Sequence, residues 1–421
     1  RKFARGRKPE RDDAKMNRYY AVESMMTASG SNADQRIRIK PGEIDEFLRA
    51  LLHEITVVRG RGGLDAAAIS ALGDAGNAQF AEIGAIADDL LAHSAVVMVG
   101  RHLPAETHAL GVMLNQAIGA IGQGRIIDPR HALPYSNDKT AEMESLREEL
   151  RGGKVGVLIF GDVNPAYSMP GDMFRTLTSR VLYRFSLSQY ADESSKSCSI
   201  FIPVNHYLEA WGDAAMFDGS QAVVQPLIAP LNEAQPSLAD ALMGIARSYD
   251  EKNFADTANF YEYVRARWQT EVFPRIGGAA FPGFWTGALR TGSVKLEPAG
   301  GGAALRPDAT ARMLRKTAAV PAAGMMLGVL PSHSLDDGRY ANTGWLMELP
   351  DPVTKTTWDN LAIMSRATAE ALGVKQEDVV EVRTEAGTTR LPVFVQPGVA
   401  DDVVITHTGF GRQEGGRVLA D

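Results

Sequence analysis

The chain has 421 residues, enough for two to four structural units. Hydrophobic residues make up 45% and charged residues 23%, an ordinary globular composition that excludes a disordered chain, a collagen-like repeat and a coiled coil. The 44 Lys and Arg against 51 Asp and Glu give a net charge of −7. This acidic balance argues against a general nucleic-acid binder, because phosphate contacts need a basic surface.

The single cysteine, Cys198, limits what the chain can hold. Iron–sulfur clusters and most structural zinc sites need several thiolates, so this chain alone forms neither, and it has no internal disulfide. No apolar run approaches the roughly 18 residues of a membrane-spanning helix. The chain begins at Arg1 with a basic stretch that lacks the apolar core of a signal peptide, so we expect a processed product or a piece of a longer protein.

Helical and strand patterns alternate in the first half of the chain. From Glu43 the apolar residues recur at helical spacing and predict a helix with one buried stripe. Short apolar runs bounded by glycine are typical of strands buried on both faces. This alternation predicts crossover connections on a mostly parallel, doubly wound α/β sheet. Beyond the first helix, the predicted helices are 80–91, 107–121, 141–150 and 171–179, and the predicted strands are 95–99, 155–160, 181–187 and 200–204.

The pattern changes toward the carboxyl end. Ser237 and Asp240 form a capping box that predicts a helix to Tyr249, and a further helix is expected around Trp268. A stretch rich in Gly, Ala and Pro follows, and the last hundred residues show short strands separated by turns. We therefore expect three parts: an α/β body at 1–276, a crossing at 277–320 and a β-barrel-like domain at 321–421.

Two loops have the composition of ligand sites at strand ends, 100–102 and 161–165. Ligands of parallel sheets bind outside the carboxyl ends of the strands, where such loops converge. Without further context, the composition of each loop favours an ordinary turn between a strand and a helix. Neither matches the phosphate-binding loop of nucleotide hydrolases or the dinucleotide fingerprint.

Other polar clusters leave alternatives open. In a helix, His206, Glu209 and Asp213 would share one face and could ligate a metal, whereas in a loop they would satisfy backbone groups. The stretch 333–339 is either a ligand clamp or a solvated loop. Cys198 has no neighbours that would activate a nucleophile and reads as an inert residue at a strand end.

Several segments together resemble the large subunit of molybdopterin oxidoreductases, whose cofactor is a molybdenum or tungsten bis(pterin guanine dinucleotide). The resemblance covers nearly the whole chain and includes the final β-barrel domain of that family. Its segments fall in the family's order: Ala33-Asp34, 38–42, Gly161 with Asn164-Pro165, 202–212, Gly373, Asp378, Pro397-Gly398 and 409–412.

Longer phrases resemble the B subunit (ActB) of bacterial alternative complex III. These phrases are 16–24, 206–213, 225–230 and 345–355. In that complex a molybdopterin-oxidoreductase-like half, understood to lack the cofactor, is fused to a half that carries iron–sulfur clusters. The family's metal-ligand loop and cluster cysteines would lie before residue 1.

One departure from the active family concerns the guanine-binding position. Active relatives follow Pro-Gly with a small hydroxylated residue and an Asp, whereas Glu43 and Ile44 follow Pro41-Gly42 in this chain. Ile44 cannot accept hydrogen bonds from guanine, and Glu43 adds negative charge where an anionic cofactor would bind.

The resemblance implies a non-catalytic scaffold domain of a quinol-oxidising respiratory complex. The chain would lie on the periplasmic face of the membrane. Its partners would be the iron–sulfur part of the same subunit, a multihaem cytochrome c subunit and a quinol-binding membrane subunit. No catalytic, cofactor-binding or metal-ligating residue is expected in this chain. A vestigial pterin crevice would be lined by Asp34, Pro41, Gly42, Gly161, Asn164, His206, Glu209, His333 and Arg412.

Two other interpretations remain. The chain could be a fragment of an active molybdopterin enzyme, in which six of these residues would line the pterins: Asp34, Asn164, His206, Glu209, His333 and Arg412. It could also be an unrelated doubly wound nucleotide-binding protein.

Overall fold

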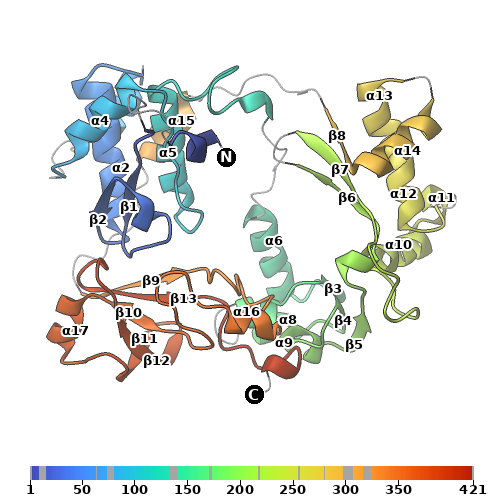
Figure 1. Cartoon of the computed structure of the whole chain (residues 1–421). Coiled ribbons are helices and arrows are strands. Elements are labelled where there is room, and N and C mark those ends of the chain that lie inside the picture. The colour runs from blue at the N-terminus through green and yellow to red at the C-terminus, as the bar shows by residue number, and fades with distance from the viewer. Residues whose placement is uncertain are drawn as a thin grey trace. The chain divides into compact units, whose positions relative to one another are not determined.

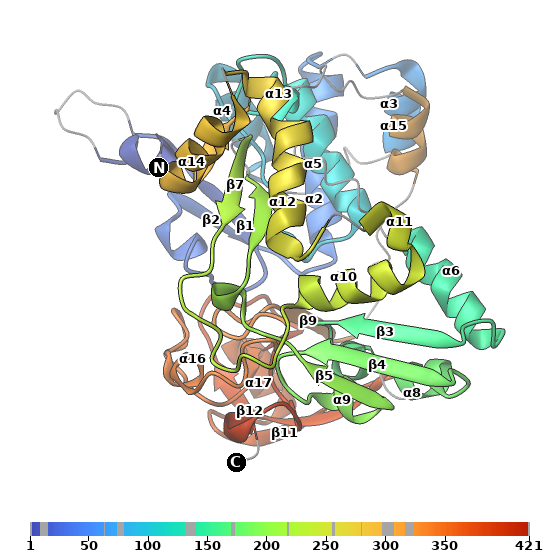
Figure 2. The ribbon, with the colours of Figure 1, turned by 90° about the vertical axis from the view of Figure 1, so that its right-hand side faces the viewer.

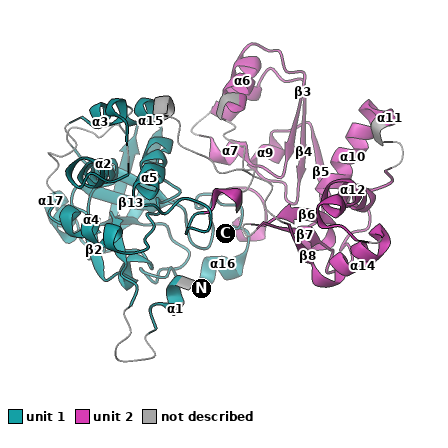
Figure 3. Ribbon diagram, turned by 90° about the horizontal axis from the view of Figure 1, so that it is seen from above, with its two compact units in different colours: residues 1–127, 304–411 teal, residues 128–303, 412–421 magenta. Residues whose placement is uncertain are grey.

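The computed structural model describes residues 2–8, 16–62, 64–73, 80–131, 140–169, 173–216, 219–254, 257–278, 280–296, 307–315 and 324–419. The chain forms two units, unit 1 from residues 1–127 and 304–411 and unit 2 from residues 128–303 and 412–421 (Figure 1 and Figure 3). Each unit joins distant segments, whereas the expected domains follow chain order. A Gly-rich stretch precedes residue 304, where the chain passes from unit 2 back to unit 1. The composition near residue 127 gives no such sign of the first change, from unit 1 to unit 2.

The amino-terminal part of unit 1 combines a two-stranded parallel sheet with a helical layer (Figure 1). Its elements are α1 (Lys2–Arg5), β1 (Tyr20–Glu23), a 3₁₀ turn (Gly30–Asn32), β2 (Gln35–Arg38), α2 (Glu43–His53), a π-helical turn (Glu54–Val58), α3 (Ala66–Leu72), α4 (Ile83–Ala92), α5 (Ala105–Ala117) and α15 (Pro307–Leu314).

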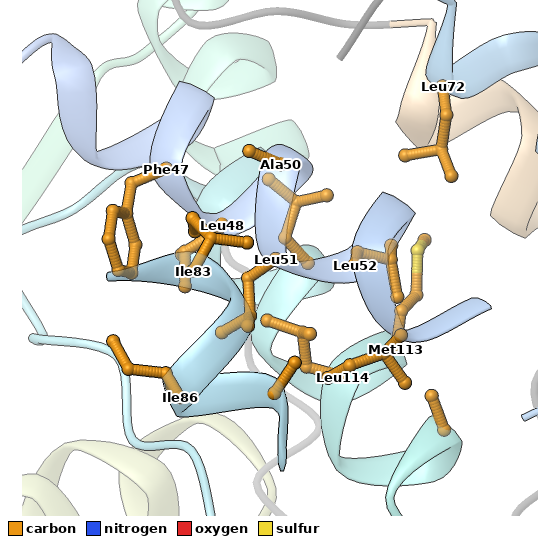
Figure 4. Packing of buried hydrophobic residues seen from close by; sticks show 14 of the residues in the cluster. Phe47, Leu48, Ala50, Leu51, Leu52, Leu72, Ile83, Ile86, Met113 and Leu114 are labelled. Atoms are coloured by element: carbon orange, nitrogen blue, oxygen red, sulfur yellow. The ribbon is translucent and has the colours of Figure 1, made fainter. Parts of the chain in front are cut away.

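The predicted apolar stripe of α2 forms the centre of this layer. Leu52 is fully buried and Phe47 and Leu51 are 2% exposed, packed among side chains of α4 and α5 (Figure 4). Within the same helix Arg49 Nε donates to Asp45 Oδ2 at 2.6 Å, and both residues are buried. The prediction of this helix is confirmed.

Residues 95–99, predicted as a strand, adopt no regular secondary structure. The side chain of Asn115 on α5 takes the place of a neighbouring strand: its Nδ2 donates to the carbonyl oxygen of Val97 at 2.7 Å, and its Oδ1 accepts from Val97 N at 2.8 Å. Periodicity could not reveal this, because one buried side-chain amide satisfies the backbone groups that a β-ladder would otherwise pair.

The carboxyl-terminal part of unit 1 is a mixed five-stranded sheet in the order β11-β12-β10-β13-β9. β9 pairs parallel to β13 and β10 pairs parallel to β12, while the other two pairs are antiparallel. Alternate side chains of β10 and β13 enter two hydrophobic clusters, on opposite faces of the sheet. The elements are β9 (Met326–Leu330), α16 (Gly344–Glu348), β10 (Ala362–Met364), α17 (Arg366–Leu372), β11 (Val379–Thr384), β12 (Gly387–Val395) and β13 (Val403–His407).

Unit 2 contains the predicted parallel sheet, in the order β3-β4-β5 (Figure 2). The α/β class expected from the alternation of helices and strands is thereby confirmed. The elements of this sheet and its connections are α6 (Thr140–Arg151), β3 (Val157–Gly161), α7 (Pro165–Ser168), α8 (Met173–Thr178), β4 (Tyr183–Ser188), α9 (Glu193–Lys196) and β5 (Ile200–Pro203).

An antiparallel sheet and a helical cluster complete unit 2. The sheet has the order β6-β7-β8. The helix predicted from Ser237 to Tyr249 is confirmed as α10, and Ser237 is its N-cap, since Ser237 Oγ accepts from Asp240 N at 3.0 Å. The elements are β6 (Gly212–Ala215), β7 (Ser220–Val224), α10 (Leu238–Tyr249), α11 (Glu251–Phe254), α12 (Phe260–Arg267), a π-helical turn (Trp268–Val272), α13 (Phe273–Ile276), α14 (Phe281–Thr291) and β8 (Ser293–Lys295), with a final 3₁₀ turn (Arg417–Leu419).

The segment expected to be a crossing, 277–320, contains helices α14 and α15 and strand β8. α14 has Pro282 in its first turn and ends at Gly292 in the left-handed region, both favourable positions for these residues. Its Trp285 is buried, with its ring 5.5 Å from that of Trp268. Aromatic burial thus outweighs the glycine content that indicated a linker. Residues 279, 297–306 and 316–320 of this segment lie outside the described residues.

Across the described ranges, none of the helices combines the length and apolar character needed to span a bilayer.

We expect Asn115→Leu to lower the free energy of unfolding by about 1–3 kcal/mol, because the N–H and C=O groups of Val97 lose their partners. Urea denaturation followed by circular dichroism measures the change. Gln116→Leu makes the same chemical change at an exposed position of α5 and should stay within about 0.5 kcal/mol of the parent. Equal losses in the two variants would contradict the assigned role of Asn115.

Candidate functional site

The carboxyl ends of β3 and β4 carry a group of hydrogen-bonded polar side chains. β3 ends at Gly161, and the chain turns through Asp162, whose φ is +51°, to Asn164 before α7. After β4 the chain reaches Glu193 in the first turn of α9. Parallel strands bring these loops to one edge of the sheet, where ligands of such folds bind. Part of the predicted loop 161–165 therefore lies beside Glu193.

The carboxylate of Glu193 accepts hydrogen bonds from three directions. Asn164 Nδ2 donates to Oε2 at 2.7 Å, and Arg412 Nε lies 3.0 Å from both carboxylate oxygens. The backbone N–H groups of Gln413 and Glu414 donate to Oε1 at 2.9 and 3.2 Å. A single carboxylate thus collects a guanidinium, an amide and two consecutive main-chain N–H groups.

The guanidinium of Arg412 is held on several sides. Its side chain is 8% exposed, and that of Glu193 is 16% exposed. The guanidinium carbon lies 5.1 Å from the centre of the Tyr167 ring, and Nη2 donates to the carbonyl oxygen of Glu414 at 2.9 Å. At the surface beside this cluster, Lys196 Nζ is 2.6 Å from Glu414 Oε2. Residues 412–414 are therefore fixed to the loop after β4.

Asn164 also connects the two strand-end loops. Its Oδ1 accepts from Ser194 Oγ at 2.7 Å and from Ser194 N at 3.2 Å, and Ala166 N donates to Ser194 Oγ at 2.9 Å. Beside them Asp192 caps α9, because its Oδ1 accepts from the N and Oγ of Ser195 at 2.8 Å. Ser194 and Ser195 are buried. These bonds fix the amide of Asn164 so that its Nδ2 points to Glu193.

Electrostatics favour the ionised form of Glu193. Burial by itself would raise the pKa of its carboxyl, but the hydrogen bonds from Arg412, Gln413 N and Asn164 outweigh burial and lower the pKa from 4.5 to about 2. Burial raises the pKa of the nearby Cys198 thiol to about 11, and its Sγ donates to the carbonyl oxygen of Ser194 at 3.2 Å. At neutral pH Glu193 is therefore ionised, and the thiol of Cys198, before the start of β5, is protonated.

The helical face proposed for His206, Glu209 and Asp213 is wrong. Tyr207–Glu209 is a single 3₁₀ turn, and Asp213 lies in strand β6. Glu209 Oε2 accepts from Leu231 N at 3.3 Å, and His206 Nδ1 accepts from Leu208 N at 3.3 Å. The loop alternative, in which these side chains satisfy backbone groups, describes His206 and Glu209.

Asp213 has different partners, since its carboxylate accepts from Arg267 and from Trp268 Nε1. Over the part of the chain that the structure describes, no three His, Cys, Asp or Glu side chains gather as metal ligands.

Asp34 lies in unit 1 at the turn before β2. Its Oδ2 accepts from Arg7 Nη1 and from Tyr19 N, both at 2.7 Å. The Arg7 guanidinium lowers the pKa of this carboxyl below its usual value. Asp34 therefore fixes the amino-terminal segment to the loop before β2.

Pro41 and Gly42 lead directly into α2. Glu43 Oε2 accepts from Lys40 N at 2.7 Å, so this carboxylate closes the turn that begins the helix. Ile44 is 9% exposed and belongs to the core around α2. The two residues that depart from the family pattern thus have structural roles.

His333 lines a cavity of about 60 Å³ in unit 1, together with His407 and Asp351. Burial lowers the pKa of His407, with the Asp351 carboxylate opposing it and His333 adding to the fall. Asp351 Oδ1 accepts from Thr354 N at 2.7 Å and from Val353 N at 2.9 Å, which lowers the pKa of Asp351 although burial would raise it.

The rest of the loop 333–339 forms ion pairs within unit 1. Asp336 Oδ1 is 2.5 Å from Arg101 Nη2, so the predicted strand-end loop 100–102 is joined to it. Asp337 Oδ2 is 2.6 Å from Arg339 Nη2.

Of the predicted residues, Asn164 and Arg412 are brought together, through Glu193. Gly161 lies at the end of the same strand, with a Leu238 methyl 3.5 Å from where its Cβ would stand. Sequence reasoning missed Glu193, Tyr167 and His407. Glu193 lies in the connection that follows β4, and the rule that selected Asn164, in the connection after β3, applies to that connection as well.

Residues 338–419 match the family described as the Molydopterin dinucleotide binding domain. The menaquinone reductase, molybdopterin-binding-like subunit, of Nitratidesulfovibrio vulgaris is 25% identical over 326 residues, which is 72% of this chain and 44% of that protein. The chain thus spans less than half the length of this curated relative.

The fold is similar to that of acetylene hydratase from Pelobacter acetylenicus, with a TM-score of 0.68 and 13% identity. The match covers 93% of this chain and 67% of that one. At this identity the likeness concerns the fold alone.

We expect Glu193→Gln to destabilise the chain by about 1–3 kcal/mol at pH 7, because a neutral amide cannot replace the carboxylate beside Arg412. The pKa of Glu193 is lower in the folded chain, so its stabilising contribution is complete above pH 4.5 and is lost as the pH falls through about 2. The difference in unfolding free energy between parent and variant should therefore shrink below pH 4.5, as urea titrations between pH 3 and 7 will measure.

Glu414→Gln removes a carboxylate from the exposed pair with Lys196 and serves as the control. It should change stability by less than about 1 kcal/mol at pH 7. A difference between parent and Glu193→Gln that stays constant from pH 7 to pH 3 would contradict the assignment.

Proposed function

We propose that this chain, a molybdopterin-oxidoreductase-like protein, is a non-catalytic scaffold domain in a membrane-bound, quinol-oxidising respiratory complex of the alternative complex III type. The similarity to a menaquinone reductase subunit supports a place in a quinone-linked respiratory complex. The observation that carries the non-catalytic role is the Glu193 carboxylate, which engages the hydrogen-bond donors at the carboxyl edge of the parallel sheet.

With Glu193 in place, the donors at this edge are already engaged and do not face the phosphates of a pterin dinucleotide as free groups. The Glu193 carboxylate occupies the amide of Asn164 and the Nε of Arg412, and its negative charge opposes the approach of an anion. The loop before α2 fits the guanine no better, because Glu43 accepts from the backbone and Ile44 is packed in the core. Five of the residues expected at the old crevice have hydrogen-bond partners within their own unit instead: Asp34, Asn164, His206, Glu209 and Arg412.

The proposed partners follow from the same resemblance. The chain would position an iron–sulfur domain of the same subunit and dock a multihaem cytochrome c subunit and a quinol-binding membrane subunit. We place it on the periplasmic face as a peripheral part. Electrons would pass through cofactors of the partners, and the chain would supply a fixed surface between them.

A second candidate is an active molybdopterin-dependent oxidoreductase subunit. The match of residues 338–419 to a dinucleotide-binding domain favours it. In that case the cofactor would supply the redox chemistry. Arg412 would have to break its hydrogen bonds with Glu193 before it could bind the cofactor.

Metal analysis of the intact, purified complex separates the two candidates. We expect molybdenum and tungsten well below one atom per complex by mass spectrometry, with iron from the clusters and haems as the internal standard. Stoichiometric molybdenum or tungsten would reject the scaffold role.

Substitution of His206 tests the same proposal by activity. We expect His206→Ala in the intact complex to keep its quinol oxidation rate within about twofold of the parent, because the His206 ring bonds to a backbone N–H of its own loop. Native gel electrophoresis verifies assembly. Selective loss of turnover in a fully assembled complex would count against the scaffold role.

A further inference from the structure

The surroundings of Glu193 have the composition of an anion-binding site. Arginine binds carboxylate and phosphate with similar geometry, and a charged acceptor makes each of these hydrogen bonds stronger. Arg412 Nε, Asn164 Nδ2 and the N–H groups of Gln413 and Glu414 all lie within 3.2 Å of one or both carboxylate oxygens. These donors come from two distant parts of the chain and converge on one acceptor group.

The backbone contribution is that of an anion nest. Successive main-chain N–H groups that point to the same atom form a concavity that binds anions, and Gln413 N and Glu414 N both donate to Oε1. Glycines shape the flanks of this segment: φ is +75° at Gly411 and +120° at Gly415. A Cβ at Gly415 would stand 2.8 Å from Arg412 Nη2, so a side chain there would collide with the guanidinium.

We propose that these donors form a binding site for a tetrahedral oxyanion such as inorganic phosphate, and that the Glu193 side chain occupies this site as a built-in anion. The site is closed in the parent chain, and removal of the carboxylate opens it. This inference rests on contacts within unit 2 and does not depend on the proposed function.

A purely structural role of Glu193 predicts a different result when its carboxylate is removed. If Glu193 only holds residues 412–414 in place, its removal loosens that segment and leaves nothing for phosphate to bind. If the donors form an anion site, Arg412 and the nest stay arranged around the space and take up phosphate. The Asn164 amide supports the second outcome, because it is fixed independently by Ser194.

The test is phosphate binding by Glu193→Ala, measured by calorimetry and by thermal unfolding at pH 7 and constant ionic strength. We expect saturable binding of inorganic phosphate by the variant, at least about tenfold tighter than by the parent. Phosphate should also raise the melting temperature of the variant toward that of the parent, while chloride should not. Equal phosphate binding by variant and parent, or rescue by chloride as well, would overturn the proposal.

Two control variants make the result specific. Glu414→Ala also removes one negative charge close to Arg412, namely the carboxylate that pairs with Lys196. This variant should not gain phosphate binding. The double variant Glu193→Ala with Arg412→Gln should lose the gain. Phosphate binding by either control would show nonspecific attraction and reject the site.

If Glu193→Ala does not fold in chloride buffer, its refolding yield replaces the binding measurement. A higher yield in phosphate than in chloride at equal ionic strength supports the site, and equal yields overturn it.

Discussion

A carboxylate that is largely removed from water must be paired, and in unit 2 this requirement determines how residues 412–414 are held. Removing Glu193 from water opposes its charge, so its ionised form persists because guanidinium, amide and backbone N–H groups surround it. The same bonds attach residues 412–414 to the loop after β4, more than 200 residues earlier in the sequence. In unit 1 the buried pair of Asp45 and Arg49 obeys the same rule, and there Arg49 also donates to the carbonyl oxygen of Leu314.

Sequence patterns over a few neighbouring residues predicted the elements that are stabilised by contacts between such neighbours. The stripe of α2 and the capping of α10 by Ser237 depend on residues within a few positions of each other, and both are present. The strand expected at 95–99 is absent, and both backbone groups of its central residue, Val97, bond instead to Asn115, 18 residues later. The helix α14 was hidden by its glycines, since its burial depends on Trp268 from a different helix.

The site was predicted only in part, because some of its contacts join residues that are far apart in the sequence. The rule that ligands bind at the carboxyl ends of parallel strands selected Gly161 and Asn164, and the family resemblance selected Arg412. Neither identified Glu193, because its importance comes from partners in the last ten residues of the chain. His206 and Glu209 were grouped by a helical spacing that their 3₁₀ turn does not have.

A fold can persist when its chemistry changes, provided that the buried polar groups of the old site keep partners. Donors left without an acceptor cost free energy, so a fold without its anionic ligand needs either apolar replacements or an acceptor from the chain itself. On the scaffold proposal Ile44 is such an apolar replacement, and its side chain is packed in the core of unit 1. Glu193 is an acceptor from the chain itself: its carboxylate accepts hydrogen bonds from Asn164, Arg412 and the backbone N–H groups of Gln413 and Glu414. In the proposed scaffold role, these contacts within each unit would hold the loops in place for the partners of the complex.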